Sequence, residues 1–202
     1  MDNNNSSKQV LVSILGVAIL IVAVVGISFA AFSYSKTGTV SNTITTGTIT
    51  MSYTEPTNGI NLTNALPITD TAGKALSGNN NTFDFSVSAT ISGNTTINYA
   101  ITAVKGDGCT VEDNGIKVYL TDQENAQILA PTKVTALTST TSDNAAGAPA
   151  GQYVLKTGTY SDVGTKTDKY RLRMWVADDY AAPTTTQEYI LKVNVYGKAA
   201  AK

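Results

Sequence analysis

The chain has 202 residues, a formal net charge of −1, one cysteine and no histidine. Charged residues make up only 14% of it, which excludes the basic surface that nucleic-acid binding requires. The lack of histidine excludes the commonest zinc ligand and every catalytic pair of histidine with serine or cysteine. The single Cys109 excludes an intrachain disulfide.

An apolar run of eighteen residues without a charge, residues 10–27, opens the chain. As a helix it would rise about 27 Å, close to the hydrocarbon thickness of a bilayer. The small residues Ser28 and Ala30 precede a cleavage position between Ala30 and Ala31. We predict a signal peptide over residues 1–30 and a secreted or cell-surface domain over residues 31–202. The alternative is an uncleaved signal anchor, a single membrane span within residues 10–32 with the domain outside.

The segment behind the cleavage position is extended and free of proline. Phe32, Tyr34 and Val40 are in phase along it, as the residues on one face of a strand are. Such a segment can be the first strand of its own sheet, or it can add as a donor strand to the sheet of the next subunit. Charged residues and proline normally keep an edge strand from pairing with another chain, and Lys36 is the only such residue in residues 31–40. Both interpretations therefore stay open.

Hydrophobic and polar residues then alternate with period two, which is typical of antiparallel strands that bury one face. Seven such segments follow one another in the chain. Their apolar residues are Ile49, Met51, Tyr53; Phe83, Phe85, Val87, Ala89, Ile91; Ile97, Tyr99, Ile101; Ile116, Val118, Leu120; Tyr153, Leu155; Tyr170, Leu172, Met174, Val176; and Tyr189, Leu191, Val193, Val195. We predict one all-β domain, an antiparallel β-sandwich or jelly roll.

Two stretches interrupt this alternation. Residues 54–81 are rich in Asn, Thr, Gly and Pro, so we expect a loop or an irregular sheet edge there. Residues 138–151 consist mainly of Ser, Thr, Ala and Gly, which predicts an exposed, flexible insertion. No segment carries a sustained helical stripe, and residues 122–129 and 133–137 could hold one helical turn each at most.

The strand over residues 170–176 carries the most distinctive polar face. Arg171, Arg173 and Trp175 alternate with its apolar residues, and guanidinium groups near an indole form a cation–π surface of the kind found at interaction sites. The competing interpretations are that this face is simply exposed, or that Trp175 fills the rim of the core.

No residue spacing favours catalysis or ligand binding through a known motif. Phosphate-binding glycine loops and the calcium-loop pattern are absent from the sequence, so we predict no enzyme activity and no cofactor or metal site. Cys109 lies beside Asp107 and Gly108, where a small turn residue is the simpler interpretation and a reactive thiol the other.

The junction residues resemble a known family. Ser28-Phe29-Ala30-Ala31-Phe32, followed by Ser41-Asn42-Thr43-Ile44-Thr45-Thr46-Gly47-Thr48-Ile49, is similar to the start of the TasA/camelysin family of Gram-positive bacteria. The close resemblance covers about residues 15–53, and this chain differs in its longer, less basic signal and its Asn- and Thr-rich insertions. It implies processing by a SipW-type signal peptidase, a jelly-roll domain, and assembly into biofilm matrix fibres. The metalloprotease class given to camelysin is not carried over, because no histidine is present.

Together these observations predict an exported structural protein whose main partner is itself. The expected assembly is an extracellular homopolymer formed by donation of the N-terminal strand, with a signal peptidase as partner during export. The alternative is a membrane-anchored monomeric module that binds a partner or polymer through the face of Arg171, Arg173 and Trp175.

Overall fold

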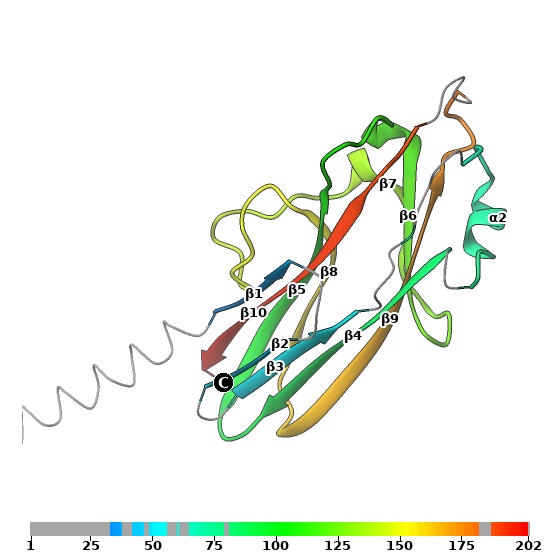
Figure 1. The fold of residues 1–202 in the computed structure, drawn as a ribbon. Helices are drawn as coiled ribbons and strands as arrows, with labels where there is room; N and C mark the ends of the chain where they lie inside the picture. The colour runs from blue at the N-terminus through cyan, green and yellow to red at the C-terminus, as the bar shows by residue number, and fades with distance from the viewer. Residues whose placement is uncertain are drawn as a thin grey trace, which may run out of the picture. The chain divides into compact units, whose positions relative to one another are not determined.

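Figure 1 presents the computed structural model, which describes residues 33–37, 42–46, 49–55, 60, 65–78, 81–181 and 187–201. The chain divides into two compact units, Met1–Ser33 and Tyr34–Lys202. Apart from Ser33, every described residue belongs to the second unit. The predicted signal helix lies outside the described residues, and no helix among those described is long and apolar enough to cross a membrane.

The second unit contains two β-sheets. Sheet A has four strands, in the order β1 (Ser33–Thr37), β10 (Leu191–Ala201), β5 (Thr95–Lys105) and β8 (Tyr153–Tyr160). Sheet B has six strands, in the order β2 (Asn42–Thr46), β3 (Ile49–Thr54), β4 (Thr82–Ile91), β9 (Gly164–Val176), β6 (Ile116–Asp122) and β7 (Gln127–Lys133). The pairings β10–β5, β5–β8, β2–β3, β3–β4, β4–β9, β9–β6 and β6–β7 are all antiparallel, which confirms the predicted all-β class.

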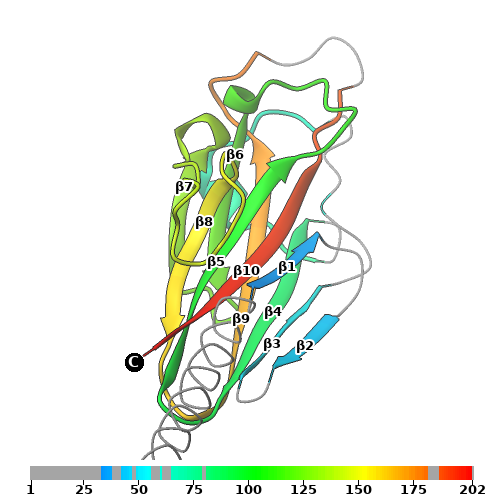
Figure 2. The same ribbon diagram turned by 90° about the vertical axis from the view of Figure 1, so that its left-hand side faces the viewer.

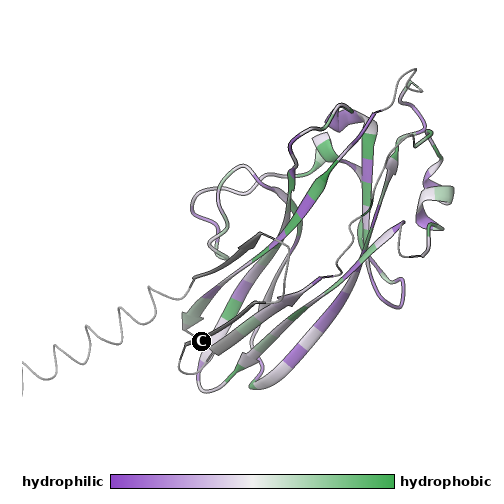
Figure 3. Cartoon of the chain, in the orientation of Figure 1, coloured by the Kyte–Doolittle hydropathy of each residue, from purple (hydrophilic) through white to green (hydrophobic). Residues whose placement is uncertain are grey.

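The period-two pattern decides which face of each strand is buried. Along β4 the predicted apolar residues, Phe83 to Ile91 in steps of two, are buried, while Ser86 and Ser88 on the other face are partly exposed. Hydrophilic and hydrophobic residues alternate in the same way along β6 in Figure 3. The buried faces of both sheets form one β-sandwich-like core.

Tyrosines connect the two sheets inside this core. The Tyr99 ring of β5 stacks on the Tyr160 ring of β8, with centroids 4.6 Å apart. Across the core, the Tyr99 and Tyr170 hydroxyls lie 3.1 Å apart, and Tyr160 donates to a carboxylate oxygen of Asp168 on β9 at 2.9 Å. Burial raises the pKa of the Tyr160 and Tyr170 hydroxyls, so both stay neutral donors. The period-two pattern marks Tyr99 and Tyr170 as apolar positions, but their hydroxyl groups also need partners.

Several elements differ from the sequence prediction. Strand β7, residues 127–133, begins inside segment 122–129, which is predicted to hold one helical turn at most, and it forms a hairpin with β6. Asn125 sits in the turn with a φ of 67°, a left-handed conformation that asparagine tolerates better than most residues. The single turn expected near residue 133 is confirmed as the 3₁₀ helix Val134–Ala136, and a second 3₁₀ turn, Asp113–Gly115, precedes β6.

The stretch 54–81, predicted as a loop, contains one short helix, α2 (Asp70–Lys74). The Thr69 side chain caps it by accepting a hydrogen bond from the Ala72 N–H, and Asp70 in the first turn complements the helix dipole. Figure 1 shows α2 beside sheet B, close to β9 and β6. This position decides the environment of the outer face of β9.

Candidate functional site

The predicted donor strand is only partly described. Tyr34 lies in β1, whereas Phe32, Val40 and the cleavage residues Ala30 and Ala31 lie outside the described residues. In this single chain β1 joins the edge of its own sheet A, beside β10 (Figure 2). The backbone therefore adopts the arrangement in which the segment is the first strand of its own sheet, and the donated arrangement stays a prediction.

The expected interaction face on β9 is not exposed. Trp175 is only 1% exposed because α2 covers it, and Gly73 of that helix lies directly against the indole ring. Arg173 is only 4% exposed. Arg171 alone reaches the surface, and it is occupied by a bidentate pair with Asp84 on β4, at 2.8 and 2.6 Å. The expectation of a cation–π surface is therefore wrong, and Trp175 belongs to the packed interior.

Arg173 instead ties two loops to sheet B. Its Nε donates to the Leu76 carbonyl at 2.7 Å, and its two terminal nitrogens donate to the Thr121 hydroxyl at 3.3 Å and the Asn125 side-chain oxygen at 2.6 Å. The guanidinium also lies 5.7 Å from the centre of the Tyr119 ring. Among the salt bridges of the described residues none involves Arg173, so neutral oxygens and one aromatic ring hold this buried charge.

The segment predicted as a flexible insertion, residues 138–151, is folded against the outer face of sheet A. Its start pairs with the start of β8, where Thr140 N–H donates to the Gln152 carbonyl and Val154 N–H to the Thr138 carbonyl, both at 2.8 Å. Asn144 closes the loop: its amide nitrogen donates to the Thr141 and Ala148 carbonyls at 2.6 Å, and its oxygen accepts from Ala148 N–H at 2.9 Å. Asparagine thus supplies internal hydrogen bonds that composition alone does not reveal.

A small apolar cluster holds this loop on the sheet. Ala146 and Ala148 are buried against Ala100 of β5 and Tyr196 of β10. The Tyr196 hydroxyl accepts a hydrogen bond from Gln152 at 2.9 Å. The prediction of a flexible insertion is therefore wrong, because alanines too small to form a recognisable stripe still bury their side chains.

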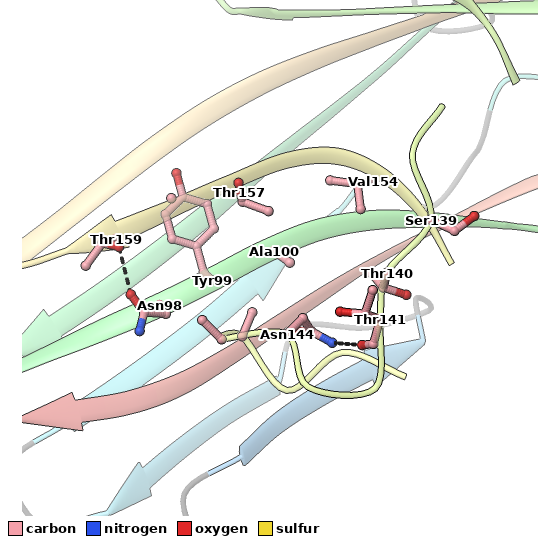
Figure 4. Close-up of a pocket in the computed structure, with 13 residues that line it drawn as sticks. Asn98, Tyr99, Ala100, Ser139, Thr140, Thr141, Asn144, Val154, Thr157 and Thr159 are labelled. Atoms are coloured by element: carbon pink, nitrogen blue, oxygen red, sulfur yellow. Dashed lines mark hydrogen bonds between the residues drawn. The ribbon is translucent and has the colours of Figure 1, made fainter. Parts of the chain in front are cut away.

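Between this loop and strands β5 and β8 lies a groove of about 390 Å³, shown in Figure 4. Its strand side is lined by Asn98, Tyr99, Ala100, Val154, Thr157, Gly158 and Thr159, and its loop side by Ser139, Thr140, Thr141, Asn144, Ala145 and Ala146. None of these residues is charged. The volume is within the range of natural ligand sites, and no sequence motif marks the groove.

At one end of the unit, Asp113 gathers three donors. Its carboxylate accepts from Tyr153 at 2.6 Å and Tyr189 at 3.1 Å, and it pairs with Lys105 at 2.9 Å. Burial works against the charge of Asp113, but these hydrogen bonds together hold its pKa below the usual value. Cys109 lies nearby as a loop residue, where its sulfur accepts from the Ile190 N–H at 3.1 Å.

No protein-family model matches this chain, and no curated protein matches it by sequence. The assignment of function therefore depends on the residues themselves. Two features offer a role beyond packing: the sheet edge that β1 occupies and the uncharged groove. No cluster of metal-ligating side chains occurs among the described residues.

The Asp113 cluster predicts how stability changes at alkaline pH. The hydrogen bond to Asp113, and then burial, raise the pKa of Tyr153 to about 12. The unfolded chain therefore loses this proton near pH 10, before the folded chain does, and stability falls as pH rises from about 10 to 12. We expect Tyr153 to contribute a slope of about 1.4 kcal/mol per pH unit in that window.

Urea unfolding between pH 8 and pH 12 measures this slope, with Tyr153→Phe as the comparison. The variant should be less stable at pH 8 and should lose less stability above pH 10. A slope in Tyr153→Phe equal to that of the unaltered chain would contradict the assigned role of the tyrosine.

Proposed function

We propose that this chain is an exported structural protein that self-assembles into fibres at the cell surface or in the extracellular matrix, with β1 of each subunit completing the sheet of a neighbour. The observation that carries the proposal is the position of β1 at the edge of sheet A, directly beside the last strand, β10. Cleavage between Ala30 and Ala31 would leave β1 two residues from the new amino terminus.

The finer fold that we propose is a jelly roll. Its support is the nested pairing of the strands: β1 with β10, β4 with β9, β5 with β8, and β6 with β7. Once β2 and β3 are set apart as an added hairpin, the first strand pairs with the last, the second with the second last, and so on inward, as in an eight-stranded jelly roll. In this fold β1 is a constituent strand, so a subunit that donates its own β1 needs the β1 of another subunit beside its β10.

Exchange of β1 between subunits would change which chain supplies the strand, while the ladder beside β10 stays the same. The difference in free energy between a subunit that keeps β1 and one that receives it from a neighbour then comes mainly from association and from the short connection over residues 38–41. With five residues, β1 has few ladder bonds to break before it can leave. The resemblance of residues 28–49 to the TasA/camelysin family supports the same assignment, including its matrix fibres and SipW-type processing.

Deletion of residues 31–40 from the chain should abolish filaments in negative-stain electron microscopy and sedimentation, because no subunit can then donate β1. A synthetic peptide of residues 31–40, added to the deletion variant, should restore stability to unfolding without restoring filaments. This complementation separates loss of assembly from loss of folding. Filaments that persist after the deletion would contradict strand donation.

Membrane anchoring is decided by the fate of the apolar run. N-terminal sequencing of the extracellular protein should give Ala31 as the first residue, because the small residues before it suit a signal peptidase. An intact N-terminus on a membrane-bound protein would favour the monomeric anchored module instead. The contact face expected for that alternative is not available to a partner, since Arg173 and Trp175 are buried.

A further inference from the structure

We propose that the groove between residues 138–151 and the outer face of sheet A binds a neutral saccharide chain. This inference does not depend on fibre formation, because the groove is lined by β5, β8 and the loop, and no residue of β1 contributes to its lining. It assigns a ligand class to a surface for which the sequence has no motif.

The groove is held in shape by its own framework. The Asn144 side chain makes three hydrogen bonds within the loop, and Ala146 and Ala148 are buried on sheet A. Thr140 adds a further link, since its hydroxyl donates to the Pro149 carbonyl and accepts from Gln152 N–H. A ligand therefore meets a wall that is already ordered, and little conformational entropy is lost on binding.

Three polar groups in the groove make no hydrogen bond to another described residue and are open to a ligand: the hydroxyls of Ser139 and Thr157, two solvent-exposed residues, and the amide nitrogen of the half-buried Asn98. The Asn98 oxygen accepts from Thr159 at 2.8 Å, which turns the amide nitrogen away from that hydroxyl (Figure 4). These groups donate and accept hydrogen bonds without carrying charge, as the hydroxyl groups of a sugar do.

The rest of the lining also suits a neutral sugar. Ala145 and Gly158 are small and leave apolar surface against which the C–H faces of a sugar ring can pack. A charged polymer would find no opposite charge in the lining. Tyr99 is only 4% exposed and offers no ring for stacking, so we expect a weak site with a Kd of about 1 mM.

An amide NMR titration of the full chain in dodecylphosphocholine micelles tests the inference with cellohexaose as the probe and hexagalacturonate as its charged counterpart. Cellohexaose should shift the amides of Asn98, Ser139 and Thr157, and hexagalacturonate should not. Micelles keep the apolar run in solution without a sugar headgroup that would compete.

Two variants remove single groups from the groove. Thr157→Val deletes a hydroxyl at constant shape, and Asn98→Asp replaces the amide donors with a charge while keeping an acceptor for Thr159. Each should raise the Kd for cellohexaose about five-fold, the equivalent of one lost hydrogen bond. The matched control Thr165→Val removes an exposed strand hydroxyl on sheet B and should leave the Kd unchanged.

Several results would overturn the inference: no shifts with cellohexaose, equal shifts with hexagalacturonate, or unchanged affinity in both groove variants. A peptide of residues 31–40 that shifts the groove amides while cellohexaose does not would reassign the groove to a protein segment. None of these results bears on filament formation, which is measured separately by the deletion of residues 31–40.

Discussion

Gly73→Val should lift helix α2 from sheet B and move the only tryptophan of the chain toward water. A Cβ atom at position 73 would overlap the buried Trp175 ring, which cannot retreat because it is packed in the interior. Overpacking at such a contact costs about 3 kcal/mol unless the helix moves away. The Trp175 indole N–H has no partner among the described residues, so water would satisfy it once the helix has lifted.

Tryptophan fluorescence and urea unfolding measure this effect. The emission of Gly73→Val should shift to longer wavelength under native conditions, and its free energy of unfolding should fall. Ala72→Val on the same helix is the control, because Ala72 is exposed and its added methyl groups meet solvent. Equal fluorescence in the two variants would contradict the contact between Gly73 and Trp175.

The sequence predicts the strands well and their surroundings poorly, for a physical reason. Period-two alternation reports which side of a strand is buried, so residues 83–91 and 116–122 are recognised correctly. It does not report what covers the other side. Arg173 and Trp175 alternate as an exposed polar face should, yet a five-residue helix from a distant loop lies over them. A helix this short has too few turns to form a recognisable apolar stripe.

The groove could not be predicted for a related reason. Its wall depends on Asn144 bonding two carbonyls inside a loop, and a run of Ser, Thr, Ala and Gly looks the same in sequence whether or not such bonds form. The signal that was available is a single asparagine between small residues, Asn144 before Ala145. It is too common in turns to identify a folded loop by itself.

Arg173→Ala should cost about 3 kcal/mol of folding stability, the second large effect. The substitution removes three hydrogen bonds and leaves the Leu76 carbonyl, the Thr121 hydroxyl and the Asn125 oxygen without their donor. Arg173→Lys should recover little of this, because one ammonium group cannot reach three acceptors that a planar guanidinium spans. Urea unfolding measures all of these changes.

Arg171→Ala, two residues along the same strand, is the matched control. Its pair with Asp84 is partly exposed to solvent, with side-chain exposures of 26% and 35%, so its loss should cost less than about 1 kcal/mol. A cost for Arg171→Ala equal to that of Arg173→Ala would contradict the role assigned to the buried arginine.

The double variant Gly73→Val with Arg173→Ala tests whether both residues fix the same segment. Arg173 holds the Leu76 carbonyl, just beyond the end of α2, and Gly73 lies within the helix against Trp175. If either change alone frees residues 65–78 from sheet B, the second change removes few further contacts. The loss in free energy of unfolding for the double variant should then be smaller than the sum of the two single losses. Strict additivity would mean that helix and arginine stabilise the sheet independently, and that the covering of the β9 face is two separate contacts.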